Sequence, residues 1–340
     1  INMEVVAIDI GGTKMDISVV YENGQILSET RQRIEPTPRD PQEALRILAD
    51  YILRNWRQYN VKAVGIGAPG IVGGKNGGYF LPNVSNLPEW NNFNLRGNLE
   101  SRLTENIGEK IPLSVESDVY SATAAELLIR IASLRDVMPN GLFPFFYLTI
   151  STGVGGEQAI NNGSDWEIYR NERGVTEVGH GRFFGTATDL NPLECGCKKF
   201  DCAETWLGGN HMRKRYGAEP QYATSEIIST VAQNLANFLY QNELTRNSKV
   251  IVVGGKIANE WEHLSHSFID ETRHNMGILF YQSGFPTPNL EVSLLGNNVG
   301  IVGGWAIAMK QLTGKWPKYP ISLIPNGSYA KISQLSPAIP

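Results

Sequence analysis

The sequence predicts an α/β protein built around a duplicated unit. An apolar strand, a glycine-rich turn and a second strand occur in that order at Val5–Tyr21. The same order returns at Phe145–Ile160, about 140 residues later. Segments with apolar residues at helical spacing alternate with further short apolar strands between and after these two units. This alternation is typical of an α/β fold.

Size and composition limit the possible functions. With 340 residues the chain is long enough for two domains, and its hydrophobic and charged contents of 41% and 19% fit a soluble globular protein. The formal net charge of −4 predicts no basic surface for nucleic acid. No apolar run is long enough to span a bilayer, and no secretory signal opens the sequence. We therefore expect a cytoplasmic protein with neither nucleic-acid nor membrane partners.

The first half begins with a three-stranded antiparallel meander. Val5–Ile10 and Met15–Tyr21 are its first two strands, and an Asn-Gly turn leads to a third strand near Gln25–Arg33. A helix follows, with Asp40 as its cap and Pro41 at its first position. The later elements predicted are a strand at Val61–Ile66, a ligand-facing loop to Asn92, a helix at Leu95–Asn106, a strand at Pro112–Val115 and a helix at Ser121–Leu134.

The second half repeats the pattern and then extends it. Strands are expected at Phe145–Ile150 and Glu157–Ile160, on either side of a second glycine-rich turn. The remaining predictions are an amphipathic helix at Ser225–Tyr240, a strand at Lys249–Val253, a helix at Trp261–Asn275, a strand at Leu290–Leu295, a helix to Leu312 and a surface tail.

The two glycine-rich turns are candidate phosphate sites. Glycine lets backbone N–H groups approach phosphate oxygens without a Cβ in the way, although a glycine turn often only closes a hairpin. Neither turn matches the P-loop or the dinucleotide fingerprint. Beside the first turn, Asp9 and Thr13 could position Mg²⁺ and a phosphate oxygen, while Lys14 either adds a charge or faces solvent.

Asp118 is the candidate general base. Phosphoryl transfer to an alcohol needs a carboxylate within hydrogen-bond reach of the attacking hydroxyl. Asp118 follows a predicted strand and precedes a helix, so it could equally serve only as that helix's cap. The spacing leaves both interpretations open.

All three cysteines lie in one short window, Cys195, Cys197 and Cys202, downstream of His180. Three thiolates and one imidazole form a complete tetrahedral set for zinc, which would be structural because no open position remains for water. The alternatives are buried free cysteines, or a disulfide that leaves one thiol over. Two carboxylates, Glu177 and Glu204, flank this loop.

Several ordered motifs together resemble the ROK family (repressors, open reading frames and sugar kinases). The resemblance runs from about Val5 to Leu312, and the cysteine motif with Glu177-Val-Gly-His180 is its most specific part. The other matching segments are Asp9-Ile-Gly-Gly-Thr-Lys14, Gly65-Ile-Gly-Ala-Pro-Gly70, Val115-Glu-Ser-Asp118, Ser151-Thr-Gly-Val-Gly-Gly156, Gly254-Gly255 and Leu295–Gly304.

The resemblance implies a two-domain actin/hexokinase (ribonuclease H-like) fold with a cleft between the domains. It implies an ATP-dependent kinase that phosphorylates the 6-hydroxyl of a hexose or N-acetylhexosamine, with Asp118 as base. The implied ligands are ATP, Mg²⁺ and structural Zn²⁺, with His180, Cys195, Cys197 and Cys202 on zinc. The implied sugar contacts are Gly70, Asn83, Ser117, Asp118, Glu177, His180 and Glu204. The implied nucleotide contacts are Asp9, Gly11, Gly12, Thr13, Lys14, Ser151, Thr152, Gly153, Gly155, Gly254 and Gly255.

Three features depart from the family pattern. Ser117 stands where the family usually has Asn, and Ser151 and Glu157 stand where its second turn usually has glycine. Lys198, Phe200 and Asp201 fill a segment that usually holds small residues. These departures leave the identity of the sugar open.

We expect residues 1–118, joined by the helix at 299–313, to form a smaller domain. Residues 119–298 would form a larger domain with the zinc loop at 177–204, followed by a tail at 314–340. The resemblance implies a homodimer or homotetramer. The family's other branch, sugar-responsive regulators, usually carries an N-terminal DNA-binding domain. Because the first strand begins within a few residues of the start of this sequence, we expect a kinase and not a regulator. A silent sugar-binding protein, suggested by Ser117 and Glu157, is a third and weaker alternative.

Overall fold

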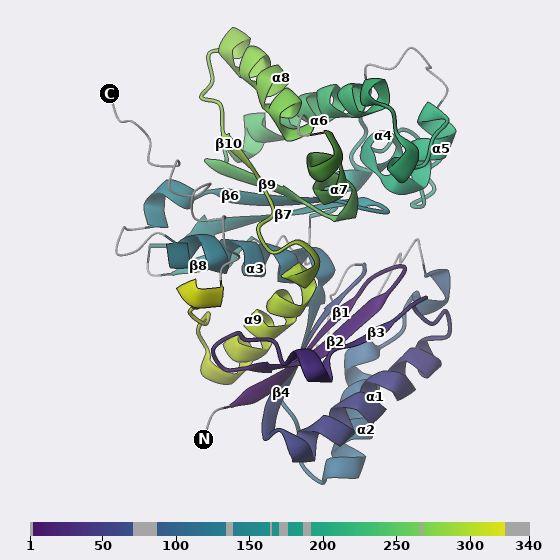
Figure 1. Cartoon of the computed structure of the whole chain (residues 1–340), viewed down its shortest axis with the longest axis vertical. Coiled ribbons are helices and arrows are strands. Elements are labelled where there is room, and N and C mark those ends of the chain that lie inside the picture. Colours follow the sequence, from purple (N-terminus) through teal and green to yellow (C-terminus); the bar gives the residue numbers. More distant parts are fainter. Residues whose placement is uncertain are drawn as a thin grey trace. The chain divides into compact units, whose positions relative to one another are not determined.

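The computed structural model describes residues 3–70, 87–133, 139–163, 165–169, 176–185, 192–265 and 268–323. Contacts divide them into two units. The first consists of the described residues up to 133 and from 297 to 323, and the second of those between 139 and 296. Each unit contains a five-stranded sheet (Figure 1).

The sheet of the first unit has the strand order β3-β2-β1-β4-β5. Strand β1 is antiparallel to β2 and parallel to β4, while β2–β3 pair antiparallel and β4–β5 pair parallel. The parallel strands therefore end at one edge of the sheet. The bounds are β1 Glu4–Ile10, β2 Met15–Tyr21, β3 Gln32–Ile34, β4 Val61–Ala68 and β5 Leu113–Ser117.

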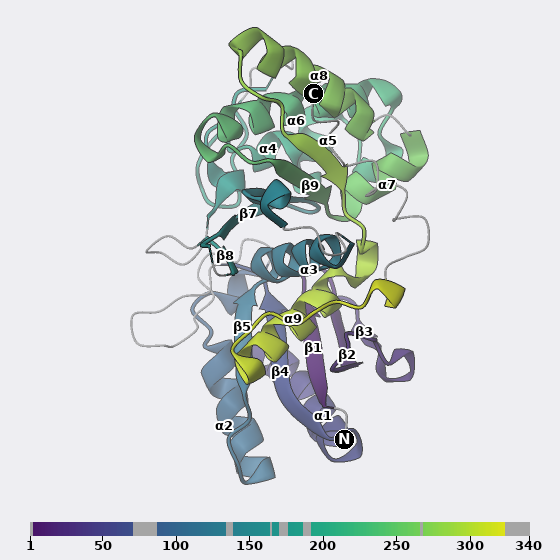
Figure 2. The same cartoon turned by 90° about the vertical axis from the view of Figure 1, so that its left-hand side faces the viewer.

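Helices cover both faces of this sheet (Figures 1 and 2). Alternate β1 side chains such as Val6 and Ile8 join a buried core with residues of α1 and α2. On the opposite face, Ala7 and Asp9 lie against α9, where glycines allow close approach. The bounds are α1 Pro41–Gln58, α2 Leu95–Ile107, α3 Asp118–Ser133 and α9 Val299–Thr313, with 3-10 helices at Ser28–Thr30, Pro88–Trp90, Gly296–Asn298 and Ile321–Leu323.

The sheet of the second unit, in the order β10-β9-β6-β7-β8, repeats this topology. Strand β6 is antiparallel to β7 and parallel to β9, as β1 is to β2 and β4. The duplicated unit predicted from the sequence is confirmed. The bounds are β6 Phe145–Ile150, β7 Val154–Asn161, β8 Trp166–Ile168, β9 Val250–Gly254 and β10 Asn289–Val292.

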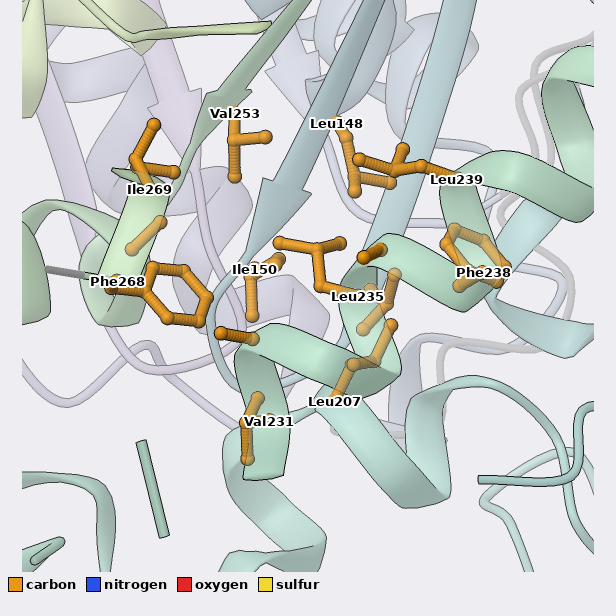
Figure 3. Packing of buried hydrophobic residues seen from close by; sticks show 14 of the residues in the cluster. Leu148, Ile150, Leu207, Val231, Leu235, Phe238, Leu239, Val253, Phe268 and Ile269 are labelled. Atoms are coloured by element: carbon orange, nitrogen blue, oxygen red, sulfur yellow. The ribbon is translucent and has the colours of Figure 1, made fainter. Parts of the chain in front are cut away.

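The core of the second unit lies between its sheet and α6 (Figure 3). Leu148, Ile150 and Val253 from the strands meet Leu235 and Leu239 of α6, all of them buried. This burial supplies most of the driving force for α6 to form a helix on the sheet. The bounds are α4 Glu204–Leu207, α5 Gly209–Tyr216, α6 Ser225–Arg246, α7 Lys256–Ser265 and α8 Phe268–Ser283, with 3-10 helices at Pro139–Leu142, Val178–His180 and Pro220–Tyr222.

Several predicted bounds differ from the structure. The third strand is only β3, because the Thr30 hydroxyl accepts the N–H of Val19 at 3.0 Å, where a longer strand would have paired. Strand β7 begins at Val154 instead of Glu157, since its first residues are the glycine turn itself. The helix predicted at Trp261–Asn275 is instead α7 and α8. Helices α4 and α5 were not predicted.

The division into units also differs from the expected boundary at residue 118. Helix α3 belongs to the first unit, because it packs against α9 and β4. Of the tail, Tyr319 is buried beside Trp305, with ring centroids 5.9 Å apart, and residues 324–340 lie outside the described part. Within the described residues, no helix is both long and apolar enough to cross a membrane.

Candidate functional site

The first glycine turn, residues 11–14, is held by three hydrogen bonds. The N–H of Gly11 donates to the Lys14 carbonyl at 2.8 Å, which closes the turn. Thr37 then binds it twice, through its hydroxyl to the Gly11 carbonyl at 2.8 Å and through its N–H to the Thr13 carbonyl at 3.0 Å. Gly12 is half-buried and Thr13 is exposed, so the outer side of the turn is accessible.

Asp9 lies at the end of β1, against the first turn of α9. A Cβ placed on Gly300 would lie 2.1 Å from the Asp9 carboxyl carbon, so only glycine leaves room for this carboxylate. Burial, with a smaller contribution from the charge of Asp16, raises the pKa of Asp9 to about 6. Asp9 thus titrates close to neutrality.

A row of charged residues crosses the sheet beside Asp9. In register, Asp9 faces Asp16 on β2, and Asp16 faces Arg33 on β3. Arg33 Nε lies 2.9 Å from the buried Asp16 carboxylate, Lys14 Nζ lies at 3.4 Å and Arg31 Nε at 3.7 Å. Burial acts to raise the pKa of Asp16, but the Arg33 hydrogen bond and the neighbouring cations hold it below its usual value. Lys14 therefore faces Asp16 and does not simply project into solvent.

Sequence reasoning missed this supporting set, Thr37, Asp16, Arg31 and Arg33. Two signals were present: an acidic residue inside the apolar run of β2, and a threonine between Pro36 and Pro38. Arg31 additionally donates to the Asn298 side chain at 2.8 Å, which ties the segment before β3 to the start of α9.

At the end of β5 the structure separates two roles that the sequence left open. The Ser117 hydroxyl accepts the N–H of Tyr120 at 3.0 Å and so caps α3. Asp118, the first residue of α3, is half-buried and accepts the N–H of Val119 at 2.8 Å through Oδ1. Ser117 therefore supplies the cap at the third helical N–H. Gly70, with a positive φ of 90°, follows β4 at the same sheet edge, and Asn83 lies outside the described residues.

The second glycine turn connects β6 and β7. Its first two carbonyls, of Ser151 and Thr152, accept the N–H groups of Gly209 at 2.8 Å and Asn210 at 3.0 Å. The Ser151 hydroxyl accepts the N–H of Lys256 at 2.8 Å, at the start of α7. Ser151 therefore has a structural role that glycine could not fill.

Gly254 and Gly255 lie beside this second turn. Strands β6 and β9 are parallel neighbours, and Thr149 faces Gly254 in the register. Gly155, the last glycine of the predicted phosphate set, faces Thr149 from the other side, on β7. The structure therefore brings the two nucleotide segments predicted in the second half, 151–155 and 254–255, to one place.

Glu157 is directed away from the turn. Its buried carboxylate accepts the N–H of Thr176 at 3.2 Å and the Thr176 hydroxyl at 2.9 Å. Its charge also acts on the half-buried Arg246 of the same unit. The carboxylate of Glu157, which departs from the family pattern, is therefore held by Thr176.

The predicted zinc ligands come together. The Nδ1 of His180 and the sulfurs of Cys195, Cys197 and Cys202 all lie within 4.8 Å of one another. Cys195 Sγ is 3.4 Å from His180 Nδ1, and the Cys197 and Cys202 sulfurs are 3.5 Å apart. Zinc bonded to sulfur and nitrogen in a tetrahedron separates its ligand atoms by about 3.5 to 3.8 Å. The donor set and spacing thus fit a tetrahedral zinc ion.

The two carboxylates that flank the cluster have different surroundings. Glu177 Oε2 lies 3.5 Å from His180 Nε2, the imidazole nitrogen turned away from the thiols. Burial, with a smaller contribution from Glu204, raises the pKa of Glu177, and His180 acts in the opposite direction. Glu204 is buried, with Oε1 3.6 Å from Cys195 Sγ. Two carboxylates and one imidazole nitrogen are thereby gathered in one region.

The thiols themselves are poorly solvated. Burial raises the pKa of Cys202 to about 11 and also raises the pKa of Cys195. A coordinated divalent cation reverses this preference, because a ligating thiol is deprotonated. Without a bound cation these two thiols are therefore protonated, and zinc binding stays a prediction.

Lys198, Phe200 and Asp201, which depart from the family pattern, belong to the loop that carries the candidate metal ligands. Lys198 and Asp201 both have positive φ, and Asp201 accepts the N–H of Leu193 at 3.4 Å and lies 3.7 Å from Arg215. The Phe200 side chain is 57% exposed. Asp201 therefore stabilises the loop, while Phe200 is a surface feature.

Comparison with known proteins identifies the family. The ROK family matches residues 5–311. A glucokinase of Streptomyces coelicolor is 30% identical over 223 residues, which cover 65% of this chain but only 61% of that enzyme. An N-acetylmannosamine kinase of Haemophilus influenzae is 25% identical over 327 residues, covering 88% of this chain and 94% of that enzyme.

The fold has the same relatives. A ROK family glucokinase from Streptomyces griseus, solved in complex with glucose and AMPPNP, superposes with a TM-score of 0.67 at 23% identity. The superposition covers 90% of this chain and 99% of that one. Since the family match spans residues 5–311 and the two-sheet fold agrees, the chain belongs to the ROK family.

Proposed function

We propose that this chain is an ATP-dependent sugar kinase that transfers the γ-phosphoryl group to the 6-hydroxyl of a hexose. One observation carries the proposal. Within the second unit, the carboxylates of Glu177 and Glu204 and the Nε2 of His180 lie in the same region as the second glycine turn. Such groups bind sugar hydroxyls, and such a turn binds phosphates. Kinases of glucose and of N-acetylmannosamine among the relatives support the same activity.

In this proposal Asp118 is the general base. Its carboxylate accepts the proton of the attacking hydroxyl as the phosphoryl group is transferred in line. The capping role of Ser117 supports the assignment, because Ser117 and not Asp118 accepts the N–H of Tyr120. Gly70, Ser117 and Asn83 remain proposed as further sugar contacts.

The nucleotide contacts are divided between the two turns. We assign the phosphates to the backbone of Gly11, Gly12 and Thr13, with Asp9 positioning Mg²⁺ through water. Lys14 forms an ion pair with Asp16 and adds positive charge to the first turn. In the second unit we assign nucleotide contacts to residues 151–155 and to Gly254–Gly255.

A zinc ion held by His180, Cys195, Cys197 and Cys202 would have a structural role. With four protein ligands it offers no position for water or substrate, and it supplies only rigidity to the loop. His180 could serve the metal through Nδ1 and a sugar hydroxyl through Nε2, because the two nitrogens face different groups.

N-acetylmannosamine or another N-acetylhexosamine is the alternative substrate. The relative that acts on N-acetylmannosamine matches 88% of this chain. The silent sugar-binding alternative loses its motivation, because Ser117 caps α3 and the Glu157 carboxylate is bound by Thr176. We also propose a homodimer or homotetramer, which light scattering coupled to size-exclusion chromatography would distinguish from a monomer.

A coupled assay of ADP release, run over glucose, N-acetylmannosamine, glucosamine, mannose and fructose, tests the function. We expect release that depends on one or two of these sugars and on Mg²⁺. Asp118→Asn serves as the matched control, because it removes the base while keeping a similar shape. Sugar-independent release would refute the proposed reaction, and equal release from Asp118→Asn would exclude Asp118 as its base.

A further inference from the structure

Val154, the fourth residue of the second glycine turn, is contacted on both sides of its backbone. Its N–H donates to Oε2 of Glu204 at 3.2 Å. Its carbonyl lies against Gly179, where an added Cβ would be 2.0 Å from the oxygen. A Cβ on Gly153 would likewise lie 2.3 Å from Glu204 Oε2. Two separate chain segments therefore fit closely around one residue of the turn.

Both segments also carry the candidate metal ligands. Gly179 immediately precedes His180, and Glu204 follows Cys202 by two residues. Glu204 also approaches a third ligand, since its Oε1 lies 3.6 Å from the sulfur of Cys195. The groups that would enclose the metal and the groups that hold Val154 are thus the same short stretches of chain.

The chain following Glu204 adds further support to the turn. Gly209 and Asn210, at the start of α5, donate their N–H groups to the carbonyls of Ser151 and Thr152. A glycine-rich turn is costly to order, because glycine loses more backbone freedom on folding than any other residue. A turn that binds phosphates must nevertheless hold its N–H groups in fixed directions. External supports therefore determine whether this turn is ready for a ligand.

We propose that the metal cluster acts as a clamp for the second glycine turn, so that metal binding supports nucleotide binding as well as the sugar site. A metal joining His180 to Cys195 and Cys202 fixes Gly179 and Glu204 on either side of Val154. Without the metal, these two segments are joined mainly by backbone hydrogen bonds, from the Ala203 N–H to the Gly181 carbonyl at 2.9 Å and from the Phe183 N–H to the Asp201 carbonyl at 2.8 Å. The turn then loses part of its support. The nucleotide part of this inference rests on the proposed function.

Nucleotide affinity measured without sugar provides the test. The chain is loaded with zinc, depleted with a chelator and reloaded, and MgADP binding to each form is followed by calorimetry, with zinc content measured in parallel. We expect about tenfold weaker binding after depletion, the size of a lost hydrogen bond to a charged group, and recovery on reloading. Equal affinity of the loaded and depleted forms would overturn the inference.

Variants separate the clamp from a general loss of folding. Glu204→Ala removes the acceptor of the Val154 N–H while keeping all four ligands, and we expect it to weaken MgADP binding although zinc remains bound. Glu194→Ala is the matched control in the same loop. Its side chain is half-exposed and pairs with Lys198 at 3.3 Å, so we expect zinc content and affinity to stay unchanged. Wild-type affinity in Glu204→Ala would contradict the role of that carboxylate.

Amide hydrogen exchange distinguishes failure of the clamp from failure of the proposed kinase. If zinc-loaded protein binds no MgADP, the proposed function is wrong. The exchange of residues 151–156 still decides the clamp, since it needs no nucleotide. Faster exchange in this turn after depletion supports the clamp, and exchange unchanged by depletion overturns it.

Discussion

The two glycine turns of this duplicated protein share a position in the fold but are supported by different means. The first turn, at residues 11–14, is held by Thr37 and lies beside the charged residues around Asp16. The second, at residues 151–156, is held by Glu204, by the start of α5 and by the N–H of Lys256. The first support comes from the sheet and the chain next to it. The second comes from a loop that carries the candidate metal ligands.

This difference shows how a duplicated unit can diverge without losing its topology. In the first unit, Thr37, which follows β3, bonds the turn directly, and Lys14 of the turn pairs with the buried Asp16. In the second, we infer that the described residues 176–185 and 192–204 depend for their order on the four candidate metal ligands, whose donor atoms lie close together. We therefore expect the order of the first turn to be insensitive to zinc and the order of the second turn to depend on zinc.

The largest expected effect lies outside both turns. Asp118→Asn should lower turnover by more than about 10³-fold, because the attacking hydroxyl loses its base. Nucleotide and sugar affinities should change little, since neither turn is altered. Steady-state kinetics with calorimetry checks both, and turnover near the wild-type rate would exclude Asp118 as the base.

Acidic pH should selectively weaken the contribution of the first turn to MgADP binding. Because burial raises the pKa of Asp9 to about 6, the carboxylate is charged above that pH and neutral below it. A neutral Asp9 no longer attracts the hydrated Mg²⁺, so MgADP binding should fall about tenfold for each pH unit below about 6. Calorimetry from pH 5 to 8 measures this. Asp9→Asn should bind weakly at every pH, and a wild-type profile in that variant would contradict the assignment.

Gly300→Ala should have the next largest effect, on stability and on Mg²⁺-dependent binding at the first turn. The added Cβ would meet the Asp9 carboxyl at 2.1 Å, so either the carboxylate or α9 must shift. We expect a loss of about 1 to 3 kcal/mol in unfolding free energy, the usual cost of overpacking, together with weaker Mg²⁺-dependent binding. Gly277→Ala in α8 is the control, because its Cβ meets no atom within 4 Å. Equal stability of the two variants, measured by urea unfolding, would argue against this close approach.

Thr37→Val should give the smallest effect. It removes the hydroxyl bond to the Gly11 carbonyl but leaves the backbone bond to Thr13 in place. One neutral hydrogen bond contributes about 1 kcal/mol, so we expect roughly fivefold weaker MgADP binding. Thr245→Val, at an exposed position of α6, should leave binding unchanged. A loss of affinity equal in both variants would mean that Thr37 does not support the turn.

Local sequence patterns predicted the central part of the fold well. Apolar runs and glycine turns identified β1, β2, β6 and β9 and the duplication, because buried strands are marked by continuous apolar runs in the sequence. The Asp40 cap of α1 was predicted for the same reason, and its carboxylate accepts the N–H of Gln42 at 2.9 Å. The four metal-ligand candidates were found because cysteines are rare in this chain.

Contacts between distant residues were not predictable from these patterns. Nothing local places Glu204 beside Val154, fifty residues earlier, or Ser151 beside Lys256. Helices α4 and α5 were missed because they are short, at four and eight residues, and are separated only by Gly208. The sequence could name Glu204 as a candidate ligand of sugar, but only the fold reveals its bond to the glycine turn.

The central proposal is that this protein phosphorylates a sugar and that zinc supports its second glycine turn. Mass spectrometry of the products tests it most directly. Zinc-loaded protein is incubated with MgATP and each sugar of the panel. We predict one sugar phosphate formed for each ADP released, and loss of this product after zinc depletion. Absence of any sugar phosphate from fully loaded protein would contradict the proposal.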